Sequence, residues 1–265
     1  MSADPSAFRS SRTWLTGSQY KTDANLAARQ SIYVYQRPRH DIAWLTVDLA
    51  GLRGGEVVTD VGCGNGVYLA ELGRRGHTGP VLGVDLSPGM LRAARGRAPG
   101  AGLTVADATA LPLPDNTGDV TLAMHMLYHV PEPAAAVREL RRVTRPGGRV
   151  LVALNGEDHL AELRGVMGEV LPRLTPRAAG TRERLSLEAG EQLLAACFTT
   201  VTRHDFTAEL VIPGPEPIAD YVRSGLFGHG REDRPELVTA VLDRMLPGPD
   251  GNIRVRTHSG CLVCS

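Results

Sequence analysis

From residue 56 onward, short apolar runs alternate with more polar segments in which apolar residues recur every three or four positions. The apolar runs are Val57–Val61, Val81–Asp85, Leu103–Ala106, Val120–Met124 and Arg149–Leu154. Runs that are apolar almost throughout are typical of parallel strands buried on both faces, and the periodic segments between them predict amphipathic helices. The alternation therefore predicts a doubly wound α/β fold.

The last third of the chain predicts the edge of that sheet. Phe198–Ile212 and Asn252–Cys264 have the character of strands, and residues 213–251 between them form an insertion bounded by proline and glycine. Two strands joined in this way favour an antiparallel pair. We therefore expect a mostly parallel, seven-stranded sheet with an antiparallel edge strand, interrupted by helical insertions at about 155–197 and 213–251.

The first 55 residues predict an N-terminal helical lid, which leaves residues 56–265 as the α/β domain. Ile42, Leu45 and Leu49 follow helical spacing until Gly54-Gly55 ends the run. Six aromatic residues fall in this segment, namely Phe8, Trp14, Tyr20, Tyr33, Tyr35 and Trp44. So many rings ahead of the first long strand indicate a lid with an aromatic inner face.

Composition and charge exclude several classes of protein. The 265 residues carry a formal net charge of zero with no Lys/Arg block, which disfavours a nucleic-acid-binding surface. No apolar run approaches the roughly 20 residues of a membrane span, and the N-terminus lacks the apolar core of a signal peptide. We therefore expect a cytoplasmic protein with neither membrane nor nucleic-acid partners.

The cysteines and histidines indicate neither a disulfide framework nor a metal site. Four cysteines are too few and too scattered for disulfide stapling. Cys261 and Cys264 have CxxC spacing, but in the expected terminal strand their side chains point to opposite faces. We therefore expect the protein to hold no metal.

The first strand of the α/β region ends in a glycine-rich loop, Asp60-Val61-Gly62-Cys63-Gly64-Asn65-Gly66, which leads into a helix. Glycine allows the backbone to approach a ligand closely, and a helix N-terminus offers free N–H groups. A dinucleotide loop of the GxGxxG type would need glycine at position 67, where this chain has Val67. The loop indicates a nucleotide-like ligand and disfavours a nicotinamide oxidoreductase.

Further acidic residues follow at the ends of the next two strands. Asp85 ends Val81–Asp85, where a carboxylate accepts hydrogen bonds from ribose hydroxyls. Asp107 and Ala108 follow the third strand, and Pro146-Gly147-Gly148 precedes the fifth.

These four elements, in this order, resemble the class I (Rossmann-like) methyltransferases that depend on S-adenosylmethionine (SAM), in particular bacterial enzymes that act on small molecules and natural products. The resemblance covers roughly residues 50–155. It implies SAM as the cofactor, with the methionine part bordered by Asp60, Gly62, Cys63 and Gly64. It also implies that Asp85 holds the ribose, and that the remaining cofactor contacts come from Leu86, Met90, Asp107, Ala108 and Met124.

Residues near the acceptor are expected where the fourth strand emerges, at Met124–Val130, because ligands sit beyond the carboxyl ends of parallel strands. His129 is the preferred general base, since histidine titrates near neutrality, and His125 or Tyr128 are alternatives that line the pocket. A packing or turn-capping role for His129 remains open. In the lid, Tyr20 or Tyr33 would place a ring against the sulfonium, and Arg29, Arg37 or Arg39 would pair the methionine carboxylate.

The sequence thus predicts methyl transfer from SAM to an O, N or C nucleophile of a small molecule, in secondary metabolism. Relatives that methylate nucleic-acid amino groups carry Asn/Asp-Pro-Pro-aromatic after the fourth strand, where this chain has Met124-His125-Met126-Leu127. A SAM-binding protein without methyl transfer, either a cyclase-like catalyst or a binding module, remains the alternative. No pattern in the sequence indicates an oligomeric state.

Overall fold

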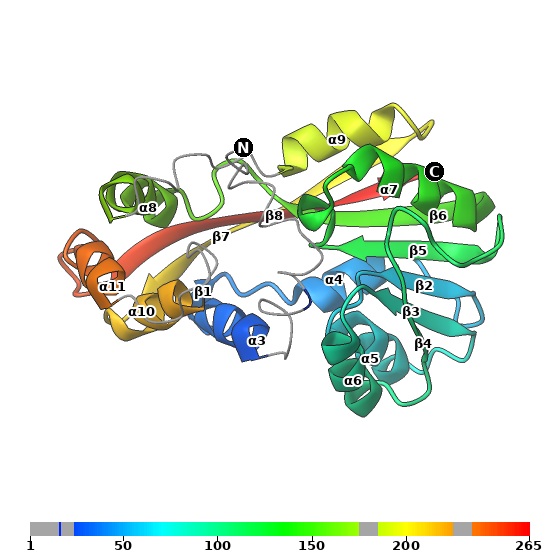
Figure 1. Cartoon of the computed structure of the whole chain (residues 1–265), viewed down its shortest axis with the longest axis horizontal. Helices are drawn as coiled ribbons and strands as arrows, with labels where there is room; N and C mark the ends of the chain where they lie inside the picture. The colour runs from blue at the N-terminus through cyan, green and yellow to red at the C-terminus, as the bar shows by residue number, and fades with distance from the viewer. Residues whose placement is uncertain (1–15, 17–23, 175–184, 225–234) are drawn as a thin grey trace, which may run out of the picture.

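One eight-stranded sheet runs through the whole molecule in the order β1-β7-β8-β6-β5-β2-β3-β4 (Figure 1). The computed structural model describes residue 16 and residues 24–174, 185–224 and 235–265. The strands are β1 (Gln36–Arg37), β2 (Val58–Val61), β3 (Val81–Asp85), β4 (Gly102–Val105), β5 (Gly118–Met124), β6 (Thr144–Asn155), β7 (Val201–Ile212) and β8 (Ile253–Cys264).

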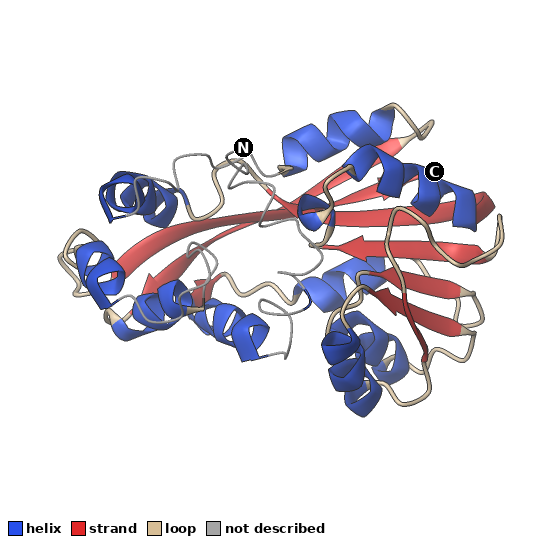
Figure 2. Ribbon diagram, viewed as in Figure 1, coloured by secondary structure: helices blue, strands red, loops and turns tan. Residues whose placement is uncertain are grey.

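The parallel core of the sheet is β4-β3-β2-β5-β6, and helices cover both of its faces (Figure 2). The doubly wound α/β fold is therefore confirmed. The described helices are α3 (Ala24–Ser31), η2 (Ile32–Tyr35), α4 (Ile42–Leu49), α5 (Val67–Arg74), α6 (Pro88–Arg97), η3 (Leu127–His129), α7 (Pro133–Val143), α8 (Ala161–Leu174), α9 (Leu187–Ala195), α10 (Glu216–Arg223) and α11 (Pro235–Leu242).

The sheet has eight strands, so the expected number of seven is wrong. The extra strand is β1, whose Gln36 and Arg37 pair antiparallel with Leu210 and Glu209 of β7. These two residues were expected to belong to a purely helical lid. A strand of two residues has no periodicity to detect, and it forms here because the outer edge of β7 offers unpaired backbone groups.

The antiparallel pair at the edge is confirmed, and it is long. β7 and β8 pair over twelve residues each, from Val201↔Cys264 to Ile212↔Ile253. β8 also pairs with β6, from Val150↔Cys264 to Asn155↔Ser259. The pair therefore lies against β6 at one end and extends beyond it at the other (Figure 1).

A second apolar core forms on the extended ends of β7 and β8. Its buried side chains come from η2, α8, α10 and α11 together with these strand ends, and they include Ile32, Met167, Ile218 and Val241. We call this part, with α3 and β1, the lid lobe. It brings together helices from the segment before β2 and from both expected insertions, although they are far apart in the sequence (Figure 1). Helix α9, from the expected insertion at 155–197, packs instead on the sheet, where Leu187 and Leu194 join the cluster of Val150.

Helix α4 belongs to the sheet rather than to the lid lobe. Its Val47, with Ala50 just beyond it, packs in one cluster with Val58 of β2 and Leu72 of α5. Trp44 on the same helix is 43% exposed, and the Arg75 guanidinium lies 4.9 Å from its ring centroid. The ring of Trp44 therefore lies at the outer surface.

The two cysteines of β8 lie on opposite faces of the sheet, as the strand period requires. Cys261 packs with the cluster that contains Leu151, and Cys264 with the cluster that contains Val150. Among the described residues, no group of three or more His, Cys, Asp or Glu side chains is placed to hold a metal ion. In the same part of the chain, no helix combines the length and apolarity that crossing a bilayer requires.

Candidate functional site

The glycine loop lies at the carboxyl end of β2, at the point where the strand order reverses between the neighbouring strands β2 and β5. Gly62, Gly64 and Gly66 have φ values of 72°, 53° and 80°, in the left-handed region that favours glycine. A Cβ on Gly62 would lie 2.7 Å from the side chain of Met126. The loop therefore needs glycine for its backbone and for its close contact with the segment after β5.

Asp85 holds this loop in place. Its Oδ2 accepts a hydrogen bond of 2.9 Å from the Gly64 amide, and its Oδ1 accepts one of 2.8 Å from the Ser87 amide. Burial raises the pKa of Asp85, and the two amide bonds oppose that rise. Because each carboxylate oxygen can accept more than one bond, the oriented group can still bind ligand hydroxyls.

Asp60, two residues before the first glycine of the loop, is the most unusual polar group of the site. It is completely buried, and neither carboxylate oxygen has a hydrogen-bond partner among the described residues. Burial, and then the nearby charge of Asp85, raise the pKa of Asp60 to about 8. An unpaired buried carboxylate is costly. A bound cation would remove this cost, so the residues present fit the ammonium group of SAM.

The other expected cofactor residues have different surroundings. The Cys63 thiol packs inward with Leu69 and Leu91, so only its backbone lines the loop. Asp107 accepts hydrogen bonds from the Thr109 amide and hydroxyl, at 2.8 and 2.7 Å. The side chain of Leu86 is half-buried. The side chains of three other expected cofactor residues are buried, namely Met90, Ala108 and Met124. Their contacts with a cofactor stay predictions.

The segment after β5 places three candidate catalytic residues beside the loop. His125 has a φ of 53° and its amide donates to the Ala153 carbonyl at 2.9 Å. Burial lowers the pKa of His125 to about 4, which keeps its ring neutral. Tyr128 and His129 follow in η3, with their rings edge to face at 4.6 Å. Which of the three acts as a base is not decided by this arrangement.

Three residues of the site were not singled out from the sequence: Tyr68, His159 and Tyr221. Burial and the nearby charge of Asp60 raise the pKa of the Tyr68 phenol, so this ring of α5 lies close to the unpaired carboxylate. His159 comes from the turn before α8, and Tyr221 from α10. Tyr68 lies two residues after the glycine loop, and this position could have identified it as a site residue from the sequence. No sequence pattern indicates the other two.

The lid residues expected to contact the cofactor are engaged within the lid. The Tyr33 hydroxyl lies 3.0 Å from the His159 Nε2, and burial, followed by the nearby phenols of Tyr221 and Tyr128, raises the pKa of Tyr33. Arg29 is buried and donates to the Ser224 carbonyl at 3.4 Å. Tyr20 lies outside the described residues.

An open cavity of about 350 Å³ lies beside α5. Its lining residues come from α3, α5 and α6 and from the start of α4, and they are Gln30, Asp41, Ala43, Val67, Ala70, Glu71, Arg74 and Arg97. Asp60, Asp85 and Asp107 are not among them. The cavity therefore borders the start of α5, where Val67 follows the glycine loop, and is not lined by the three carboxylates.

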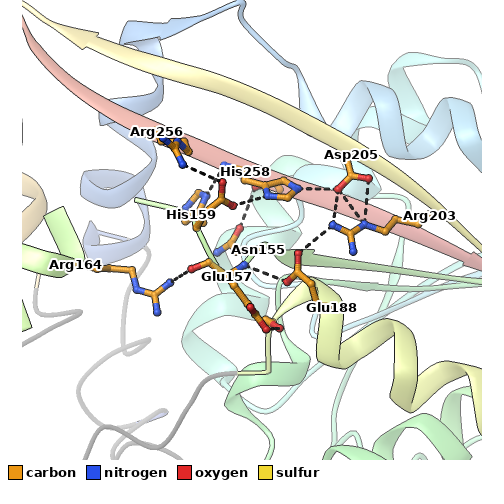
Figure 3. Close-up of polar contacts among 12 residues, drawn as sticks. Asn155, Glu157, His159, Arg164, Glu188, Arg203, Asp205, Arg256 and His258 are labelled. Atoms are coloured by element: carbon orange, nitrogen blue, oxygen red, sulfur yellow. Dashed lines mark hydrogen bonds and ion pairs between the residues drawn. The ribbon is translucent and has the colours of Figure 1, made fainter. Parts of the chain in front are cut away.

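A polar network joins the lid lobe to the sheet beside this site (Figure 3). His258 of β8 lies 2.6 Å from Asp158 through Nδ1 and 2.7 Å from Asp205 through Nε2. Carboxylates accept, so both ring nitrogens donate, which only the cationic ring can do. Burial by itself lowers the pKa of His258, but the bonds to Asp205 and Asp158 outweigh it, and the pKa lies above its ordinary value.

The same network fixes the turn that carries His159. The His258 amide donates to the His159 Nδ1 at 3.1 Å, and the Gly156 amide donates to the His258 carbonyl at 2.9 Å. A Cβ on Gly156 would lie 2.3 Å from the His258 ring, so glycine is needed for this contact. His258, on β8, therefore positions His159, which lies 99 residues away in the sequence.

Comparison with protein families identifies the central part of the chain. Residues 59–152 match the model of a methyltransferase domain. A demethylmenaquinone methyltransferase of Renibacterium salmoninarum is 36% identical over 135 residues, which cover 51% of this chain and 56% of that protein. A ubiquinone biosynthesis O-methyltransferase of Pseudomonas fluorescens SBW25 is 33% identical over 151 residues, 53% of this chain and 64% of that protein. The chain spans less than two thirds of each of these curated relatives.

Solved structures share the fold at lower identity. The YcgJ protein of Bacillus subtilis superposes with a TM-score of 0.59 at 19% identity, covering 84% of this chain and 97% of that one. The (4+2)-cyclase SpnF superposes with a TM-score of 0.55 at 22% identity, covering 84% and 80%. At these identities the neighbours show the α/β fold alone, and the description as a methyltransferase rests on the match of residues 59–152.

The His258 network predicts how stability varies with pH. A histidine whose folded pKa is raised stabilises the fold below its unfolded pKa of about 6.5, and this contribution is lost as pH rises through the folded pKa. We expect the free energy of unfolding, measured in urea, to fall as the pH rises above about 6.5, and the His258→Gln variant to lose much of this dependence.

His204→Gln is the matched control for this measurement. His204 lies on the neighbouring strand β7, and the structure records no side-chain hydrogen bond for it. This control should keep the pH dependence of the wild type. An unchanged pH dependence in His258→Gln would contradict the charged bridge.

Proposed function

Because residues 59–152 match the model of a methyltransferase domain, we propose that this chain is a class I, SAM-dependent methyltransferase that transfers the methyl group of SAM to an oxygen, nitrogen or carbon nucleophile of a small molecule. The observation that carries the proposal is the buried Asp60, whose carboxylate oxygens have no partner among the described residues. It lies directly before a glycine loop that Asp85 holds in place. These groups suit a ligand with a cationic end and a ribose.

The residues of the chain divide the binding of the cofactor between them. Asp60 would pair the ammonium group, and Asp85 would accept from the ribose hydroxyls. Leu86 follows β3 and Asp107 follows β4, and these two residues would contact the adenine. When bound, SAM supplies a methyl group already activated by the sulfonium, so the protein mainly has to align an acceptor and exclude water.

We place the acceptor between the segment after β5 and the lid lobe. The relatives that match over half of the chain are named for methylation of demethylmenaquinone and of ubiquinone precursors, which are ring compounds. Three tyrosines lie near one another in this region, namely Tyr33, Tyr128 and Tyr221. Their aromatic side chains would favour an acceptor that itself contains a ring. An oxygen-bearing aromatic or quinol-type molecule, including a natural product, is therefore the acceptor class we propose.

The test is turnover of methyl-labelled SAM with a panel of hydroxylated aromatics and demethylated quinols. We expect S-adenosylhomocysteine to form only when an acceptor is present. Asp85→Ala should weaken SAM binding by roughly 10- to 100-fold, because it removes charge-assisted hydrogen bonds and the anchor of the Gly64 amide. Tight SAM binding without transfer to any acceptor would overturn the proposal and favour a cyclase-like or binding role.

Asp60 predicts that cofactor affinity depends on pH. Its pKa of about 8 means that the side chain is mostly protonated at neutral pH before the ligand binds. Pairing with an ammonium requires the charged carboxylate, so binding should release a proton and affinity should rise between about pH 6 and pH 8.

Calorimetry with S-adenosylhomocysteine, in buffers of different ionisation enthalpy, measures this proton release directly. The Asp60→Asn variant should bind more weakly at about pH 8 and release no proton. A wild-type affinity that does not change over this range would contradict the assignment of Asp60.

For an acceptor that must lose a proton, we propose His129 as the base. The pKa of about 4 makes His125 a weak base, which favours His129 over it. His129→Asn should lower kcat by roughly 100-fold or more while SAM affinity stays unchanged. His125→Asn is the matched control, because asparagine tolerates the left-handed backbone at this position. A loss of kcat in the control alone would move the base to His125.

A further inference from the structure

Tyr33 and His159 form a stacked, hydrogen-bonded pair in the lid lobe. Tyr33 belongs to η2, and His159 to the turn before α8. Their rings stack with centroids 6.3 Å apart and planes at 21°. The phenol of Tyr128, from the segment after β5, lies near Tyr33, and the His125 ring lies near His159. The groups whose charges act on the pair therefore include Tyr128 and His125, two residues expected to surround the acceptor.

The hydrogen bonds around His159 determine where its proton sits. The His258 amide can only donate, so the His159 Nδ1 is the acceptor and carries no proton. Burial lowers the pKa of His159 to about 3, which keeps the ring neutral. A neutral ring without a proton on Nδ1 carries it on Nε2, the atom 3.0 Å from the Tyr33 hydroxyl. Nε2 is therefore the donor in this bond and the Tyr33 oxygen the acceptor.

This direction leaves the Tyr33 proton for another group. In the described part of the chain, the structure records no further hydrogen bond of this hydroxyl. Tyr33 is half-buried, so water can only partly replace the missing hydrogen-bond acceptor for its hydroxyl proton. A raised pKa keeps the phenol protonated at neutral pH, so it acts as a donor and not as a base. Its natural partner is an oxygen of a bound molecule.

We propose that the Tyr33 hydroxyl, oriented by His159, donates a hydrogen bond to a ring oxygen of the methyl acceptor and so positions that molecule. The proposal rests on the proposed function for the identity of the molecule as an acceptor. Tyr33 acts as a binding and positioning residue. The His258 network holds the turn of His159, so the donor is fixed before the acceptor arrives, which lowers the entropic cost of binding.

The probes for this subsite are 4-nitrophenol and nitrobenzene, which share a ring and differ by the hydroxyl. Both are titrated into the full-length protein saturated with S-adenosylhomocysteine. We expect the wild type to bind 4-nitrophenol more tightly than nitrobenzene. Tyr33→Phe should weaken 4-nitrophenol binding by roughly 5- to 100-fold and leave nitrobenzene binding unchanged.

Tyr35→Phe is the matched control, since Tyr35 lies on the same short helix and the structure records no hydrogen bond of its hydroxyl. It should preserve the preference for 4-nitrophenol. His159→Leu should reduce the preference because it removes the donor to Tyr33, and His159→Gln should restore part of it because the glutamine amide can still donate. These two variants also test the proposal if Tyr33→Phe proves unstable.

Three results would overturn the proposal: no binding of 4-nitrophenol to the wild type, an unchanged preference in Tyr33→Phe, or an equal loss of both probes in that variant. An equal loss of both probes would mean that the substitution disturbs the packing of the site and that the Tyr33 hydroxyl makes no hydrogen bond to the probe. The measurement requires no methyl transfer, so it separates the two proposals. A preserved preference without turnover would refute only the function, and turnover without the preference would refute only the subsite.

Discussion

Two carboxyl groups at the ends of adjacent parallel strands set the main constraint on this protein. Asp60 on β2 and Asp85 on β3 are carried toward one another because the strands run in register, with Val61 opposite Val84. Asp85 uses its charge to hold the Gly64 amide, whereas Asp60 is left buried and unpaired. The loop between them needs three glycines with positive φ. Burial raises the pKa of Asp60 to about 8, so its ionised form is costly unless a cationic group pairs with it.

The lid lobe is attached to this site through the sheet itself. β7 and β8 form the antiparallel edge of the sheet and, further along, the floor of the second apolar core. Because β7 and β8 run without interruption from the sheet into the lid lobe, the backbone hydrogen bonds between them hold the lid lobe in position relative to the sheet. The charged bridge from His258 to Asp158 and Asp205 lies along this connection. It links the turn before α8 to both edge strands.

The two sides of the site differ in chemistry. The strand ends supply carboxylates and backbone amides, which suit a charged, polar cofactor. The lid lobe and the segment after β5 supply phenols and imidazoles, and burial keeps the rings of His125 and His159 neutral. Neutral donors in an aromatic setting suit an uncharged ring with oxygen substituents. In the function proposed above, this division would separate recognition of the methyl donor from recognition of the acceptor.

The sequence alone was sufficient for the α/β class, the five parallel strands, the long antiparallel pair and the glycine loop with Asp60 and Asp85. These features depend on local patterns: apolar runs, glycine spacing, and an acid at a strand end. Local patterns also located the segment of His125, Tyr128 and His129. They did not determine which of these is a base, since the sequence does not reveal burial.

Only the tertiary structure decided the remaining features. Strand β1 is two residues long and exists because β7 has a free edge, so the sheet has eight strands. His159 and His258 appeared as isolated histidines, yet they are joined across 99 residues because β8 runs beside the turn before α8. The direction of the proton between His159 and Tyr33 follows from that contact. Such features depend on which segments meet in space, and periodicity along a chain carries no record of that.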